Sequence, residues 1–185
     1  IAQAKARFSN LAFSLADMQA KGSVSVQAAA PRPAVKADLA FNSVNLNIYS
    51  ANGPAAPAPA PDLTQDWREA MLPFNDLKAA DAEIALTMDA MTAGAVTTGP
   101  TALRATLADG KLDAHAETQA LFGGKGVLDL MLRHGDGTQM KLGLDVAGAA
   151  AKDFLGKAFG ISFLDGPVDV KADVTASGSS PAQLV

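Results

Sequence analysis

Hydrophobic and polar residues alternate along most of this chain with a period of two. Six runs show the alternation clearly, at residues 82–88, 103–107, 112–116, 128–132, 140–146 and 168–174. Successive side chains of a β-strand point to opposite faces of a sheet, so each run predicts a strand with one apolar and one polar face. Half-buried strands of this kind are typical of antiparallel sheets.

We expect the apolar positions of these runs to share one face of the sheet and to line whatever lies against it. They are Ile84, Leu86, Met88, Leu103, Leu107, Leu112, Leu128, Leu130, Leu132, Met140, Leu142, Leu144, Val146, Val168, Val170 and Val174. Met131 falls on the other register and is expected on the polar face.

Turn signals separate the runs closely. Asp109-Gly110 is a strong hairpin dipeptide, and residues 123–124, 135–137 and 165–167 also interrupt the alternation. The runs leave no room for helical crossovers, so strands that follow one another in the chain should also be neighbours in the sheet. The sequence therefore predicts an antiparallel meander.

The first 50 residues repeat the alternation more weakly, at 11–15, 24–26, 35–41 and 44–48. Residues 50–61 then read SANGPAAPAPAP, and alternating Ala and Pro cannot pair inside a sheet and favours a stiff, extended linker. We therefore divide the chain into three segments. They are the end of a preceding β unit (1–50), an Ala/Pro-rich linker with a short helix (51–76), and a C-terminal β module that is truncated at its end (77–185).

Two or three short helices are expected. Residues 62–72 and 149–159 each predict one, and Gly160 is the expected C-cap of the second. Residues 179–182 read as the start of a third, with Pro181 at its first helical position.

The predicted sheet has more apolar surface than these helices can cover. Ten strands at about 4.8 Å spacing, each about 20 Å long, give roughly 1,000 Å² of apolar face. A helix of about eleven residues shields only about 160 Å². An apolar patch above about 600 Å² is unusual on a monomer.

Three architectures would resolve this mismatch. The sheet can fold over into a self-buried sandwich or barrel, lie against lipid as an outer-membrane barrel, or curl into a trough that holds an apolar ligand. An outer-membrane barrel needs aromatic girdles and strands of about ten residues, whereas Trp67 and Tyr49 lie in or beside the linker and the strands are expected to be shorter. Periodicity alone leaves the other two open, and the sandwich is the commoner outcome.

Composition and charge exclude several functions. The net charge is −4 with no basic patch, which argues against nucleic acid as a partner. The chain has no Cys, so it has no disulfide, thiolate metal ligand or thiol nucleophile. No apolar stretch is long enough for a membrane span. Because the sequence begins at Ile1 in strand-like material and ends at Val185 after a helix-start signal, we expect a piece of a longer protein.

No catalytic constellation is evident. His115-Ala116-Glu117 matches half of a zinc deaminase pattern, but the other half requires Cys, so a solvated polar face is the better interpretation. Residues 123–126, GGKG, lack the spacing of a phosphate-binding loop and precede a strand, so we expect a turn or bulge there. We therefore predict no enzyme activity, catalytic residue, metal ligand or cofactor.

Five pieces follow one another in a recognisable order and spacing. They are LKAADAEIALTMDAM (77–91), TALRATLADGKLDAHAE (101–117), ALFGGKGVLDLML (120–132), TQMKLGLDVAGAAAKDFLGKAFG (138–160) and LDGPVDVKADVTASGSSPAQLV (164–185). The succession, rather than any single motif, resembles the C-terminal module of the AsmA family of bacterial envelope proteins. Residues 42–50, NSVNLNIYS, similarly resemble the end of the preceding unit in this family.

The resemblance implies a fold and a function. The implied fold is mainly β: a curled antiparallel meander sheet, an open taco-like groove with an apolar interior. The implied protein is periplasmic, from a Gram-negative bacterium, and anchored in the inner membrane by an N-terminal span outside this sequence. Proteins of this repeating-β-groove, bridge-like type are linked to lipid transport and outer-membrane biogenesis. Phospholipid or another acyl-chain lipid would then lie passively against the apolar positions named above.

An alternative function remains open. The same alternation would suit a ligand-free structural or protein-binding β-sandwich module of an envelope protein. On either hypothesis, sheet edges exposed at the two ends of the chain invite self-association.

Overall fold

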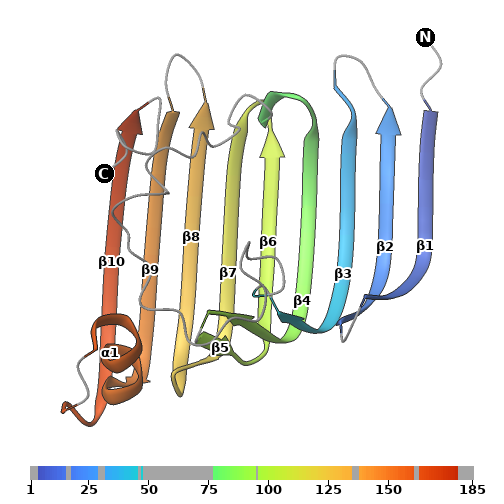
Figure 1. Ribbon diagram of the computed structural model, residues 1–185. Coiled ribbons are helices and arrows are strands. Elements are labelled where there is room, and N and C mark those ends of the chain that lie inside the picture. Colours follow the sequence, from blue (N-terminus) through green and yellow to red (C-terminus); the bar gives the residue numbers. More distant parts are fainter. Residues whose placement is uncertain are drawn as a thin grey trace.

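The computed structural model describes residues 4–15, 18–28, 32–45, 47, 77–94, 96–134, 138–160 and 163–178. These residues form one sheet of ten strands and one helix (Figure 1). The elements are β1 (Ala4–Leu15), β2 (Met18–Ala28), β3 (Ala34–Asn45), β4 (Asp81–Ala93), β5 (Val96–Thr98), β6 (Thr101–Ala108), β7 (Lys111–Leu121), β8 (Gly124–His134), β9 (Thr138–Ala150), α1 (Ala151–Phe159) and β10 (Pro167–Gly178).

The long strands lie in the sheet in the order in which they occur in the chain. β6 pairs with β4 and β7, and the short strand β5 pairs with the same two strands. All neighbours are antiparallel except β3 and β4, which pair in parallel from Ala34 with Asp81 to Asn45 with Thr92. The mainly β, mostly antiparallel fold is confirmed, but the parallel pair departs from the predicted meander.

Two features of the strands were predicted wrongly. Most strands have 11 to 13 residues rather than about six. Residues 35–41 and the start of 44–48 are one strand, because β3 continues to Asn45 with Ser43 on the apolar face. Ala, Gly, Ser and Thr extend the pairing without any contrast in hydropathy, so alternation underestimates strand length. Leu46 and Ile48 lie outside the described residues.

The turns around β7 match the expectation. Asp109 and Gly110 both have positive φ angles, 53° and 75°, as a tight two-residue hairpin requires. Phe122 and Gly123 form the next turn, with φ of 52° and 84°, and β8 begins at Gly124. The GGKG segment is therefore a turn into a strand.

The described helix, α1, begins two residues later than predicted and ends at Gly160, which has the left-handed φ of 73° expected for a C-cap. No side chain caps its start; instead the Ala151 amide donates to the Gly166 carbonyl at 2.9 Å. The Phe154 ring packs edge-on against Phe122 at 5.6 Å between centroids. The other two predicted helices, at 62–72 and 179–182, lie outside the described residues.

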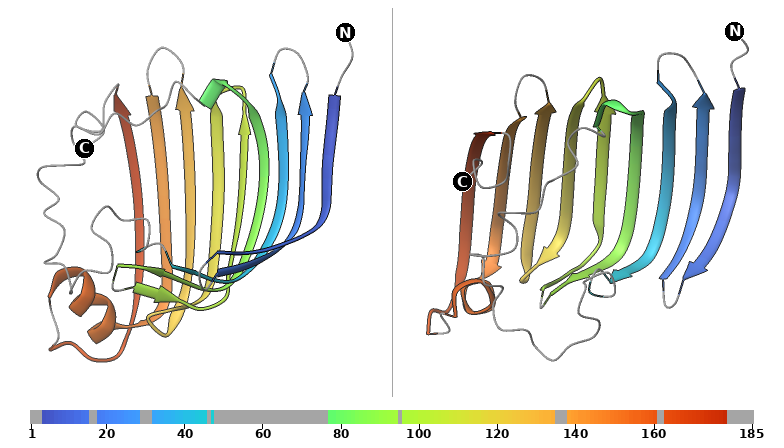
Figure 2. Two further views of the ribbon diagram at one scale, coloured as in Figure 1. Left: turned by 45° about the vertical axis from the view of Figure 1, so that its right-hand side comes forward. Right: turned by 45° about the horizontal axis from the view of Figure 1, so that its top comes forward.

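The sheet is a single curled layer. The strands run side by side in Figure 1, and Figure 2 shows their lower ends bending out of the plane of the upper halves, toward the side on which α1 lies. All described strands belong to this one sheet, so no second sheet packs against it within the described chain. The sandwich alternative is therefore wrong for these residues.

A group of charged residues links the start of β3 to the start of β4 and to the β6–β7 turn. Arg32 precedes β3, and its Nη1 donates to Asp109 Oδ1 at 2.9 Å, while its Nε lies 3.7 Å from Asp81 Oδ1. Asp81 Oδ1 also accepts the backbone N–H of Asp109 at 3.1 Å. The start of β3, the start of β4 and the β6–β7 turn are thus held together although they are far apart in sequence.

Candidate functional site

The apolar positions of nine strands form continuous rows across the sheet. Residues that pair across neighbouring strands point to the same face, so the register defines each row. We call these rows rungs. The first three, from β1 to β10, are Ala6–Val26–Val35–Ala82–Leu107–Leu112–Leu132–Met140–Ala176, Phe8–Val24–Ala37–Ile84–Ala105–Ala114–Leu130–Leu142–Val174 and Leu11–Gly22–Leu39–Leu86–Leu103–Ala116–Leu128–Leu144–Ala172.

A fourth rung follows the bend of the sheet, and we call it the crease. Its members are Phe13, Ala20, Phe41, Met88, Thr101, Thr118, Gly126, Val146 and Val170. All sixteen residues predicted to line the apolar face lie on this one face, fifteen of them in the four rungs and Val168 beyond the crease, opposite Ala149.

Burial along the crease identifies the inner side of the curl. Ala20, Met88, Thr101, Thr118 and Val146 are all buried, at 9% exposure or less. Residues next to them in sequence, such as those at 19, 87, 102, 117 and 145, point to the opposite face and are exposed. The apolar face therefore lies on the inner side of this bend, and we call it the concave face. At its middle, from β6 to β8, the crease has the small side chains of Thr101 and Thr118 and then Gly126.

Away from the crease the concave face keeps contact with solvent. Of the sixteen predicted residues, only Met88 and Val146 are buried, and the rest are half-buried or exposed. Leu128 and Val174 retain 39% and 44% of their surface. Contiguous apolar surface that stays open to solvent is uncommon, and large patches of it are typical of interaction sites.

The concave face also carries one unsatisfied polar atom. Thr101 Oγ1 lies 3.0 Å from Thr98 Oγ1 and donates to the Gly99 carbonyl at 2.9 Å. Thr118, which pairs with Thr101 across β6 and β7, has a buried hydroxyl with no hydrogen-bond partner among the described residues. The crease is thus not uniformly apolar, which alternation alone does not reveal.

Sequence analysis missed the contribution of the first three strands to this face. Phe8, Leu11, Phe13 and Leu39 lie in the same rungs as the predicted residues, and Phe13 packs edge-on against Phe41 at 6.4 Å. Their alternation was visible in the sequence. These residues were not assigned to the apolar face because the linker suggested that residues 1–50 belong to a separate unit. The pairing of β3 with β4 instead makes one continuous sheet.

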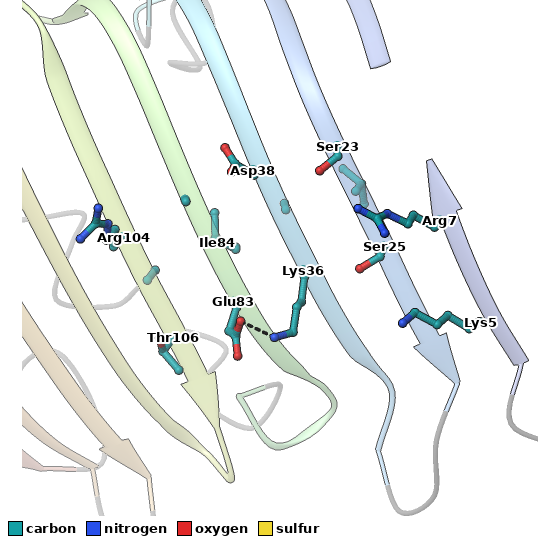
Figure 3. Close-up of a pocket in the computed structure, with 14 residues that line it drawn as sticks. Lys5, Arg7, Ser23, Ser25, Lys36, Asp38, Glu83, Ile84, Arg104 and Thr106 are labelled. Carbon is teal, nitrogen blue, oxygen red and sulfur yellow. Dashed lines mark hydrogen bonds and ion pairs between the residues drawn. The ribbon is translucent and has the colours of Figure 1, made fainter. Parts of the chain in front are cut away.

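The convex face is charged and solvated. Figure 3 views it and shows Lys5, Arg7, Lys36, Glu83 and Arg104 spread over β1 to β6 around a shallow hollow of about 640 Å³. Lys36 Nζ contacts Glu83 Oε2 at 2.6 Å, and both side chains are more than half exposed. Met131 lies on this face, in line with Asp113 and Lys141, as predicted.

His115 is on the convex face, as predicted, and both of its ring nitrogens contact carboxylates. Nδ1 lies 2.6 Å from Asp129 Oδ1, and Nε2 lies 2.9 Å from Glu117 Oε1. The hydrogen bonds to Asp129 and then Glu117 raise the pKa of His115 above its usual value. Arg104 lies directly opposite on β6, and its positive charge faces the same row.

The raised pKa predicts a small pH dependence of stability. Because the pKa is higher in the folded state, the stabilisation is complete below the unfolded pKa of about 6.5 and is lost as the pH rises through the folded pKa. The group is exposed, so we expect less than about 1 kcal/mol. Urea unfolding of the wild type and His115→Gln should differ more at about pH 5.5 than at about pH 9. A constant difference would contradict this assignment.

The comparisons identify no relative, since no protein family, curated protein or solved structure matches the chain. In the described part of the chain, no helix is long and apolar enough to cross a membrane. Among the same residues, no group of three or more His, Asp or Glu side chains is arranged to hold a metal ion. The geometry of the concave face is therefore the main basis for inferring function.

Proposed function

We propose that this chain binds the acyl chains of phospholipids, or of another acyl lipid, on its concave face, as a segment of a periplasmic lipid-transfer protein. One observation carries the proposal. Four rungs of mostly apolar residues cross nine strands on the inner side of a curled sheet, and most of their large side chains remain in contact with solvent.

The dimensions of the face suit an elongated apolar ligand. Nine strands at about 4.8 Å spacing give rungs roughly 40 Å long. Burial of each CH₂ group contributes about 0.8 kcal/mol, so a chain of a dozen or more carbons can be held without any specific polar contact. Met88 and Met140, at either side of the face, are flexible and polarizable and can adapt to chains of different shape.

The compartment and the wider role rest on the sequence resemblance. Similarity to the AsmA family over residues 77–185 supports a periplasmic location, a membrane anchor outside this sequence and a role in outer-membrane biogenesis. Binding on an open face would be passive, because it relies on apolar burial alone.

Mass spectrometry of an organic extract tests the proposal. The chain, purified without harsh detergent, should yield phospholipid in a reproducible molar ratio to protein. After removal of this lipid, it should take up a phospholipid with a fluorescent acyl chain and be displaced by an unlabelled one. A lipid-free preparation that also fails to bind the probe would refute the proposal and favour a ligand-free module.

A further inference from the structure

The sheet has two long edges with no partner strand in the described chain. β1 pairs only with β2, and β10 pairs only with β9. Each edge strand has 12 residues. An exposed edge of this length presents a row of free backbone N–H and C=O groups, which is a template for another strand.

Two backbone hydrogen bonds fix the direction in which the edge amides point. Gln119, on the convex face of β7, donates its N–H to the Pro100 carbonyl before β6, and Asp81, on the convex face of β4, donates to the Pro33 carbonyl before β3. Both donate toward the β1 side of the sheet. β1 runs in the same direction as β4 and β7, so its convex-face residues turn their N–H groups away from β2, to the open edge.

At the β10 edge, the convex-face residues also turn their N–H groups outward. β10 runs antiparallel to β4 and β7, so its convex-face residues turn their N–H groups away from β9. On both edges, the free hydrogen-bonding positions therefore belong to residues of the polar face. When an edge strand of one copy pairs with an edge strand of another copy, the polar faces of the two sheets must therefore lie on the same side.

The charges at the two edges are complementary. The charged residues of β1 are Lys5 and Arg7, and those of β10 are Asp169, Lys171 and Asp173. Lys171 is already paired with Asp145 at 2.9 Å, which leaves the aspartates of β10 in excess. Neither Lys5 nor Arg7 takes part in a salt bridge among the described residues.

We propose that copies of this chain join head to tail, with β10 of one copy paired antiparallel to β1 of the next. In this arrangement the rungs continue from one copy into the other, so Arg7 lies opposite Thr175 and its long side chain is diagonal to Asp173. The alternatives add charge of one sign at the junction: the charged residues of two β1 strands are all positive, and each of two β10 strands has two aspartates and one lysine. Head-to-tail pairing instead joins the positive edge to the edge with excess negative charge.

This association differs from a closed dimer. The two surfaces that meet are different, so the interface is heterologous and each added copy leaves a free edge at both ends. Larger assemblies should therefore form as the concentration rises. The inference stands apart from the proposed function, because it does not depend on what the concave face binds.

Proline variants can cap one edge at a time. Ala12 and Thr175 are exposed convex-face residues of β1 and β10, so their amides point to the open edges. Ala12→Pro and Thr175→Pro each remove one outward N–H without removing a hydrogen bond inside the sheet. Ala12→Ser and Thr175→Ala are matched controls. Circular dichroism and urea midpoints close to those of the controls establish that the capped variants are folded.

Sedimentation velocity then measures the association state of each variant. We expect the wild type and both controls to show a sedimentation coefficient that rises with concentration, and each capped variant alone to remain a monomer. An equimolar mixture of the two capped variants should form a species of two copies and no larger one. A monomeric wild type, a capped variant that still dimerises, or a mixture that stays monomeric would each overturn the proposal.

Discussion

Leu130→Asp should remove at least nine-tenths of the lipid that co-purifies with the chain, while Met131→Asp leaves the lipid content close to that of the wild type. Leu130 lies in the middle of the concave face, between Ala114 and Leu142 in the second rung. An acyl chain laid over this rung would strip water from the new carboxylate. Transfer of an unpaired polar group out of water costs about 1–3 kcal/mol by mutational data and more for a charge.

The adjacent residue is a matched control. Met131 is in the same strand and is also half-buried, but it points to the convex face opposite Asp113 and Lys141. The same change in volume and charge there should leave the concave face intact. Both variants should keep their strand content, because the side chain of Leu130 is only partly buried. Equal lipid loss in both variants, or outright unfolding of Leu130→Asp alone, would contradict the open groove.

Gly22→Ala should destabilise the fold by about 3 kcal/mol or more, the largest effect we expect from a single methyl group. A Cβ atom at this position would lie 1.9 Å from the Asp38 carbonyl oxygen and 2.9 Å from the Leu39 Cα, both backbone atoms of β3. Gly22 also has a φ of 151°, which side chains of L-residues rarely allow. β2 and β3 would have to separate in the third rung, next to the crease.

Gly143→Ala is the control for this substitution. Its Cβ would meet only ordinary contacts, with Asp173 Oδ1 at 3.6 Å and the Asp129 Cβ at 3.8 Å. We expect an effect within about 1 kcal/mol, since alanine also reduces the entropy of the unfolded chain. Urea unfolding followed by far-UV circular dichroism gives both values. Similar midpoints for the two variants would show that β2 and β3 can adjust to a side chain at Gly22.

Alternation in the sequence was sufficient to predict which residues share a face. Leu128, Leu130 and Leu132 keep the strict period of two, and all three point to the concave side of β8. The face assignment depends only on local backbone geometry, so it needs no knowledge of the neighbouring strands. For this reason His115 and Met131 were also placed correctly on the polar face.

Features that depend on distant parts of the chain were not accessible in this way. The parallel pairing of β3 and β4 joins residues 47 positions apart in sequence, such as Lys36 and Glu83, whose side chains form an ion pair. The crease was missed because Thr101, Thr118 and Gly126 have no apolar signature. They are buried only because the sheet bends there, and alternation carries no information about curvature.

The ends of the concave face differ in character. Along the crease, Phe13 in β1 is 45% exposed, whereas Val146 in β9, the strand that leads into α1, has no exposed surface (Figure 1). A rod-shaped amphiphile lying along the rungs would therefore have two inequivalent orientations of unequal free energy. The repetitive sheet thus carries a vectorial bias along the crease.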